Sequence, residues 1–295
     1  MGKVVHTLPK GRLVAGVTSL DDEIYLLRFK DDRDQVEVCD ATTYKLLRYL
    51  NVPNLRGLSD MTICGHYRCL YVADGCVDDC VHRLGLNGGA TTQWPINDEP
   101  AGLSVNKAHN VLVTCNAARM IKEFSSHGNL LREITLPGDI INPWHAVQLT
   151  SGQFIVCHGM LGDEVHRVCK ISADGSYIVN SHGGQPGSHP ACQYNVPIRL
   201  EVDDKEFVFV VDKGNRRVTL LSPTLDYMRQ VVPSDKLKLG PLHCIHQDGS
   251  RQSRDRRKRG PLRLHLDVRR QRLYVAVDKF KDGKNTSGRV VVFSV

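Results

Sequence analysis

The stretch GRVVVFSV, residues 288–295, is a predicted strand, and the fold depends on which other strand pairs with it. Residues 290–295 form an apolar run that only Ser294 interrupts, and no turn or further strand follows it in the sequence. An uncovered apolar strand at the edge of a sheet promotes aggregation, so we expect this strand to have a partner elsewhere in the chain. The repeat pattern of the sequence indicates where that partner lies.

A short apolar run of strand type recurs six times along the chain. The copies, which we call marker strands, are IYLLR (24–28), LYVAD (70–74), VLVTC (111–115), FIVCH (154–158), VFVVD (208–212) and LYVAV (273–277). Successive copies are 46, 41, 43, 54 and 65 residues apart. Further strand-like runs flank each copy and are separated by Gly, Asn, Asp and Ser turns, which predicts antiparallel meanders. Four strands in a unit of about 40–45 residues are typical of a propeller blade.

The last unit contains only three strands, and the beginning of the chain resembles the missing fourth. Residues 4–11, VVHTLPKG, contain TLPKG, which matches ITLPGD at residues 134–139. We therefore predict an all-β, six-bladed β-propeller of four-stranded antiparallel blades, closed by pairing of the N-terminal strand with the C-terminal blade. Residues 1–295 are expected to form one domain. Two stacked sheets are the alternative, but a sandwich does not need a constant period.

The longest step between marker strands contains a segment typical of a loop insertion. GPL occurs at residues 240–242 and again at 260–262, and without residues 240–259 the step has an ordinary length. The segment is polar and charged, which predicts disorder. Its basic run predicts nuclear import or nucleic-acid contact, with a solvated loop as the alternative. The basic residues are Arg251, Arg254, Arg256, Arg257, Lys258 and Arg259.

The unit DKGNRRVTLLSP (212–223) resembles the NHL repeat, which combines an acidic residue, a Gly-Asn pair, a basic residue and an apolar strand. NPWHAVQLTSGQFIVCHG (142–159) and the final FSV are similar to the propellers that end TRIM-NHL proteins. The resemblance covers essentially the whole chain, although only the fifth repeat carries the motif clearly. It implies a non-catalytic module that selects a protein partner. Because several TRIM-NHL propellers bind RNA, single-stranded RNA is the alternative ligand.

The repeat alignment places the loops after the marker strands and the loops entering each blade on one rim of the propeller. Cations on this rim attract phosphates and aromatic rings offer stacking surfaces, but acidic residues make its charge mixed. Packing between blades is the alternative role for Trp144, and pairing with a carboxylate of a neighbouring blade is the alternative for the arginine of GNRRV. The candidate binding residues are Arg56, Arg119, Trp144, His145, Tyr194, Lys213, Arg216, Arg217 and Lys279.

The sequence contains no recognisable catalytic or metal-binding constellation. Six-bladed hydrolases and lyases need carboxylates or histidines that converge on the central channel. ADGCVDDC (73–80) lacks the spaced oxygen ligands of a calcium loop, and HCIH (243–246) lacks a second pair of zinc ligands. A metal-dependent hydrolase or lyase is therefore the weakest alternative, and we expect no enzymatic activity, no metal and no cofactor.

Composition adds few constraints. The net charge of +7 is compatible with an anionic partner but does not require one. The chain has neither an apolar run of about 18 residues nor a secretory signal, so we expect no membrane contact and a cytoplasmic location, or a nuclear one through residues 251–259. The cysteines are expected to be reduced and buried. No DNA-reading motif is found, and the absence of heptads predicts a monomer.

Overall fold

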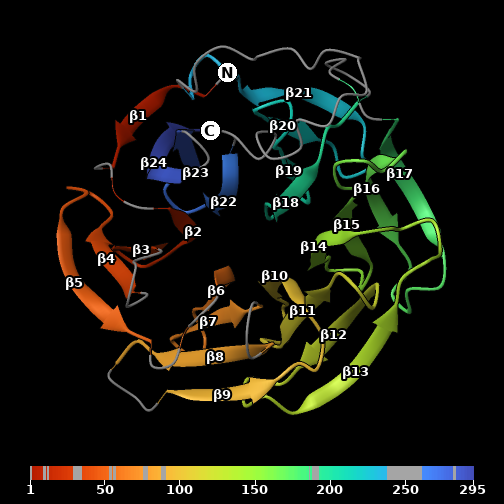
Figure 1. The fold of residues 1–295 in the computed structure, drawn as a ribbon, viewed down its shortest axis with the longest axis horizontal. Helices are drawn as coiled ribbons and strands as arrows, with labels where there is room; N and C mark the ends of the chain where they lie inside the picture. The colour runs from red at the N-terminus through yellow and green to blue at the C-terminus, as the bar shows by residue number, and fades with distance from the viewer. Residues whose placement is uncertain are drawn as a thin grey trace.

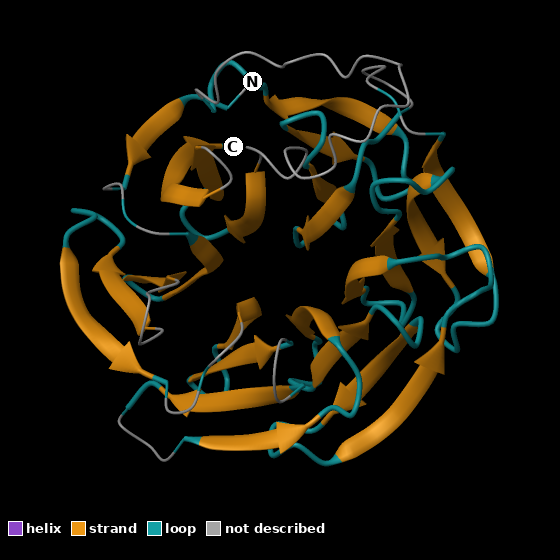
Figure 2. Cartoon of the chain, in the orientation of Figure 1, coloured by secondary structure: helices purple, strands orange, loops and turns teal. Residues whose placement is uncertain are grey.

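The computed structural model describes residues 2–8, 11, 13–28, 35–52, 55, 58–75, 79–87, 91–185, 187, 193–237, 261–281 and 284–295. For residues 58–59, 261–262, 278–281 and 284–287 only the backbone is described. The described residues form six four-stranded antiparallel sheets in a ring (Figure 1). Strands and loops account for all of them, without a helix (Figure 2). The predicted six-bladed propeller is confirmed.

We number the blades by the order in which their innermost strands occur in the chain. Blade 1 contains β2 (Val14–Leu20), β3 (Glu23–Arg28), β4 (Gln35–Asp40) and β5 (Leu46–Asn51). Blade 2 contains β6 (Leu58–Cys64), β7 (Cys69–Asp74), β8 (Cys80–Gly85) and β9 (Thr92–Pro95). Blade 3 contains β10 (Pro100–Val105), β11 (Val111–Cys115), β12 (Met120–Phe124) and β13 (Leu130–Thr135).

The other three blades follow the same plan. Blade 4 contains β14 (Pro143–Gln148), β15 (Phe154–His158), β16 (His166–Ile171) and β17 (Ile178–Gly184). Blade 5 contains β18 (Pro197–Val202), β19 (Val208–Asp212), β20 (Arg217–Leu221) and β21 (Tyr227–Val232). Blade 6 contains β22 (Pro261–Asp267), β23 (Arg272–Lys281), β24 (Lys284–Ser294) and, from the N-terminus, β1 (Val4–Thr7).

The marker strands are apolar throughout because both faces of each blade are buried. One apolar core lies at each of the six interfaces between neighbouring blades. In β3, Tyr25 and Leu27 belong to the core shared with blade 2, whereas Ile24 and Leu26 belong to the core shared with blade 6. Side chains alternate between the two faces of a strand, so a strand with two buried faces has no polar alternation.

The final strand of the sequence pairs with the first one, as predicted. β1 lies antiparallel to β24, with Val4 opposite Phe293 and Thr7 opposite Val291. The pairing continues where the Leu8 amide donates to the Val290 carbonyl at 2.9 Å. The Leu8 side chain is buried in the core between blades 6 and 1. The first and last strands therefore share one blade, which closes the ring (Figure 1).

The described cysteines are buried thiols without disulfide bonds. All seven that occur among the described residues agree with the expectation. No described helix is long and apolar enough to cross a membrane. The predicted insertion at residues 240–259, with its basic residues 251–259, lies outside the described residues.

Substitutions in the N-terminal strand test the closure. Leu8 is 1% exposed and Val5 is 43% exposed. We expect Leu8→Ala to lower the free energy of unfolding by about 2–5 kcal/mol, because it leaves a cavity in the closing core. Val5→Ala, the matched control, should change it by less than about 0.5 kcal/mol. Urea unfolding measures both, and a loss of similar size for the two variants would contradict the closure.

Candidate functional site

A bulge in the innermost strand of every blade defines six equivalent positions around the propeller axis. The pairing register shifts near the beginning of this strand in all six blades. In every blade, the first residue after the shift pairs with the fourth residue of the neighbouring marker strand. We call this set the axial ring, and it consists of Gly16, Asp60, Gly102, His145, Arg199 and Arg263.

An ion-pair network in the axial ring joins opposite blades. Arg199 of blade 5 donates from Nη1 to Oδ2 of Asp60 in blade 2, on the opposite side of the six-blade ring. Arg263 Nε lies 3.4 Å from Asp60 Oδ1, and the Leu103 amide donates to Asp60 Oδ2 at 2.7 Å. The carboxylate of Asp60 and the guanidinium of Arg199 are both buried. The network therefore braces the ring electrostatically across its axis.

Two further titratable side chains lie near the axial ring: Glu201 is two residues after Arg199 on β18, and His265 is two residues after Arg263 on β22. Burial raises the pKa of Glu201 to about 7, against the opposing effect of Arg199, whose Nη2 is 3.7 Å from Glu201 Oε1. Burial lowers the pKa of His265 to about 4, and its Nε2 lies 2.9 Å from Ser19 Oγ. At neutral pH the His265 ring is therefore uncharged, while Glu201 is partly protonated.

Four of the predicted rim residues are buried, so the expectation that they form an exposed face is wrong. His145, Tyr194, Arg216 and Arg217 are all less than a tenth exposed. His145 lies in the axial ring, where its Nε2–H donates to the Leu103 carbonyl at 2.9 Å. Tyr194 packs in the core between blades 4 and 5. Tyr194 and Arg216 lie in loops, whereas His145 lies within β14 and Arg217 begins β20, and the side chains of all four are buried in the fold.

Arg217 forms an ion pair, as the structural alternative predicted, but with a carboxylate of its own blade and not of a neighbouring one. Its Nε donates to Asp212 Oδ2 at 2.7 Å, and its Nη2 donates to the Gln193 carbonyl at 2.6 Å. Asn215 also donates to Asp212 Oδ2, at 2.8 Å. The buried Asp212 and Arg217 and the half-buried Asn215 of the NHL-like segment thus form one hydrogen-bonded network that holds a loop.

The remaining candidates differ in exposure. Trp144 is half-buried against the cores on either side of blade 5, and its indole N–H donates to the Gly159 carbonyl at 3.2 Å. Lys213 is half-buried, whereas Arg119 is exposed. Arg56 lies outside the described residues, and only the backbone of Lys279 is described. Backbone hydrogen bonds such as Lys213 N to Val196 O, at 3.2 Å, do place the two predicted sets of loops side by side.

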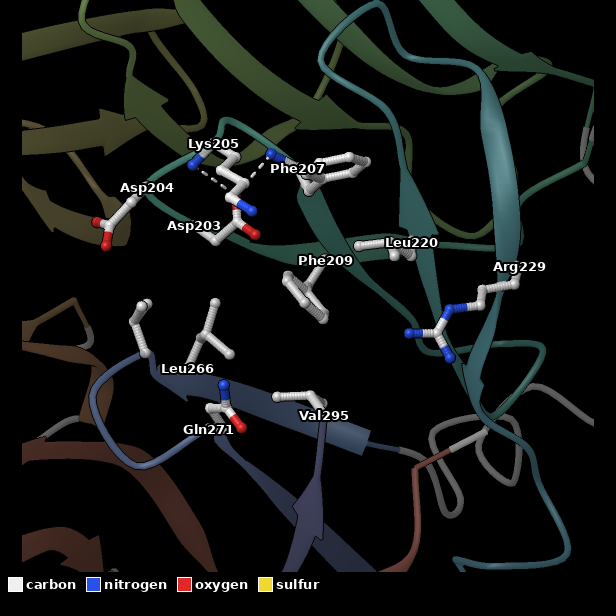
Figure 3. Close-up of a pocket in the computed structure, with 11 residues that line it drawn as sticks. Asp203, Asp204, Lys205, Phe207, Phe209, Leu220, Arg229, Leu266, Gln271 and Val295 are labelled. Atoms are coloured by element: carbon white, nitrogen blue, oxygen red, sulfur yellow. Dashed lines mark hydrogen bonds between the residues drawn. The ribbon is translucent and has the colours of Figure 1, made fainter.

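The opposite rim holds a pocket that the sequence analysis did not identify. It is a cavity of about 360 Å³ between blades 5 and 6, beside the turns that join their first and second strands (Figure 3). The lining is largely apolar, with charged side chains at the mouth. The apolar lining consists of Phe207, Phe209, Leu220, Leu266, Val268 and Val295. The polar lining consists of Asp203, Asp204, Lys205, Arg229 and Gln271. We call this site the inter-blade pocket.

Arg229 at the mouth of the inter-blade pocket differs from its counterpart in blade 3. There Arg132 lies opposite Glu123 and donates to it at 2.6 Å. In blade 5 the residue opposite Arg229 is Leu220, a wall of the pocket. Among the described residues no ion pair engages Arg229, and its side chain extends beside the pocket (Figure 3). Aligning the third strands would have revealed this Glu-to-Leu exchange in the sequence.

Comparison with known proteins shows the fold alone. Neither a protein-family model nor a curated protein matches the chain. Among solved structures, a protein of unknown function from Bacteroides caccae is 16% identical, with TM-score 0.57, and the match covers 78% of this chain and 85% of that chain. A catalytically inactive virginiamycin B lyase from Staphylococcus aureus, with quinupristin, is 10% identical, with TM-score 0.60 and coverage of 100% and 98%. Hydrazine synthase of Kuenenia stuttgartiensis is 14% identical, with TM-score 0.59 and coverage of 97% and 98%.

These neighbours support the propeller and do not confirm the NHL or TRIM resemblance. Because a lyase shares the fold, the architecture gives no support to the expectation that this chain lacks enzymatic activity.

The ion pair across the axis predicts that substitutions of Asp60 and Arg199 affect the free energy of unfolding non-additively. Asp60→Asn should lower the free energy of unfolding by about 3–5 kcal/mol, since it leaves a buried guanidinium without its carboxylate. The double variant Asp60→Leu with Arg199→Met should be more stable than the single variant Asp60→Leu. Urea unfolding of the set measures the coupling. If the losses in free energy of unfolding of the single variants simply add up in the double variant, the predicted interaction between Asp60 and Arg199 is wrong.

The raised pKa of Glu201 predicts a pH dependence of stability. Between about pH 4.5 and 7 the folded protein binds more protons at this carboxyl than the unfolded chain does, so its contribution to stability falls as pH rises. Glu201→Gln should therefore match the native protein near pH 4.5 and exceed its stability at pH 8. Glu206→Gln is the control, because the hydrogen bond from Thr150 lowers the pKa of Glu206. A stability difference for Glu201→Gln that does not change with pH would contradict this assignment.

Proposed function

We propose that this propeller is a recognition module that binds a protein partner, and that the inter-blade pocket holds an apolar side chain of that partner. The observation that carries the proposal is the combination of an apolar cavity with a charged mouth at the surface of the ring. A few apolar side chains seated in such pockets supply most of the binding energy at many protein interfaces.

The walls and the mouth of the pocket favour different parts of a ligand. Phe209 and Leu220 form an apolar wall in blade 5, and Leu266 faces them from blade 6 (Figure 3). Asp203 is already engaged, because its Oδ1 accepts the amides of Lys205 and Phe207 at 2.9 and 2.8 Å. Arg229 is the group at the mouth that suits a carboxylate. A peptide segment with an apolar residue next to an acidic one therefore fits the site.

Protein is favoured over single-stranded RNA for two reasons. The pocket is lined by two acidic and two basic side chains, so it does not concentrate positive charge as a phosphate backbone requires. On the other rim, the buried rings of His145 and Tyr194 offer no surface for stacking bases. The RNA alternative then depends on Arg119, which is exposed, on Lys213, which is half-buried, and on Arg56 and the basic run 251–259, which lie outside the described part of the chain.

A library of random dodecapeptides displayed on phage tests the proposal. We expect enrichment of peptides that combine an apolar and an acidic residue. Arg229→Glu and Val268→Glu should each weaken binding of a selected synthetic peptide at least tenfold, since they reverse or add charge at the pocket. Met228→Glu is the matched control, because Met228 is exposed on the same strand as Arg229 but does not line the pocket.

Unchanged affinity in both pocket variants would contradict the proposal. So would salt-sensitive binding of a random single-stranded RNA pool combined with no peptide enrichment.

A further inference from the structure

Blade 2 differs from blade 5 at a buried position near the end of the marker strand. In blade 5, Asp212 ends β19 and lies opposite Arg217, its ion-pair partner. In blade 2, Asp74 ends β7 at the equivalent position but lies opposite Cys80. The basic residue of the repeat is thus replaced by a thiol, while the buried carboxylate is retained.

A histidine completes a cluster with these two side chains. Cys80 Sγ lies 3.4 Å from Nε2 of His82, two residues further along the same strand. The same His82 nitrogen lies 4.0 Å from Asp74 Oδ2. Exposure is 3% for Cys80, 1% for His82 and 0% for Asp74. A nucleophile, a base and a carboxylate therefore converge in a site from which water is largely excluded.

The arrangement favours transfer of the thiol proton to the imidazole. An imidazole within hydrogen-bond reach of a thiol can hold the proton, leaving a thiolate. The Asp74 carboxylate stabilises the resulting imidazolium, and burial strengthens this attraction. Burial without such an imidazole has the opposite effect, since it raises the pKa of Cys39 to about 11 and that of Cys115 and Cys169 to about 12.

We propose that Cys80 is a reactive thiol, and that the Asp74–Cys80–His82 cluster is a modification site for small carbon electrophiles. The Cys80 sulfur attacks the electrophilic carbon, a carbon–sulfur bond forms, and the leaving group departs with the electrons of its bond to carbon. The thiol proton stays on His82. Cys80 begins β8 at an end of the blade, and its low exposure limits the site to small reagents.

Alkylation by iodoacetamide tests the proposal on the unmodified protein. Rates at individual cysteines are measured by mass spectrometry between pH 5.5 and 9. We expect Cys80 to react at least tenfold faster than Cys39, Cys115 and Cys169, with a rate that already levels off below pH 8. Equal rates, or a Cys80 rate that rises steadily up to pH 9, would overturn the proposal without any need for a variant.

Variants then assign the effect to the cluster. His82→Gln should slow alkylation of Cys80 at least tenfold and shift its pH profile upward, while His66→Gln, at an exposed histidine of the same blade, should not. Circular dichroism establishes that both variants are folded. A folded His82→Gln protein with an unchanged Cys80 rate would contradict the proposal. A second contradicting result would be that Cys80 resists alkylation until a chelator is added, because Asp74, Cys80 and His82 would then be metal ligands.

Discussion

Burial of both faces of every blade is the constraint on which the rest of the structure depends. A single four-stranded sheet from this chain is apolar on both sides, so it is stable only between two neighbours. Six blades satisfy this condition only if the ring closes, which the pairing of β1 with β24 achieves. The core between blades 6 and 1 then takes the same form as the other five.

Closure places the six innermost strands around one axis. The equivalent positions on these strands, which form the axial ring, hold different types of residue in different blades. Two glycines, a carboxylate, a histidine and two arginines occupy the axial ring, and the charged members pair across it. The same divergence occurs further out in the blades. The repeat position that holds a buried Arg in blade 5 holds a thiol in blade 2, and the position that holds Glu123 in blade 3 holds Leu220 in blade 5. Candidate sites in this protein thus arise where one blade departs from the pattern of the others.

The sequence predicted the fold well because the marker strands are largely apolar and recur six times, with the first three steps between 41 and 46 residues and the longest step explained by an insertion. It also placed the loops around Arg119 and Lys213 on one rim. It could not predict which way side chains point near strand ends, since a bulge in every first strand shifts the alternation by one residue. For this reason His145, which follows the bulge in β14, was expected at the surface but is buried. Tyr194 lies in a loop before β18 and is buried by the core between blades 4 and 5, and Arg217 begins β20 and is buried by its pairing with Asp212. The inter-blade pocket was missed because its walls come from blades 5 and 6 together, and contacts between blades are not visible in a repeat alignment.

Hydrogen–deuterium exchange with a selected peptide tests most directly whether the inter-blade pocket is the recognition site. We predict that peptide binding slows amide exchange at residues 203–209, 220–229 and 266–271, around the pocket. Slowed exchange at residues 116–119, 159–165 and 213–217 instead, on the opposite rim, would contradict it.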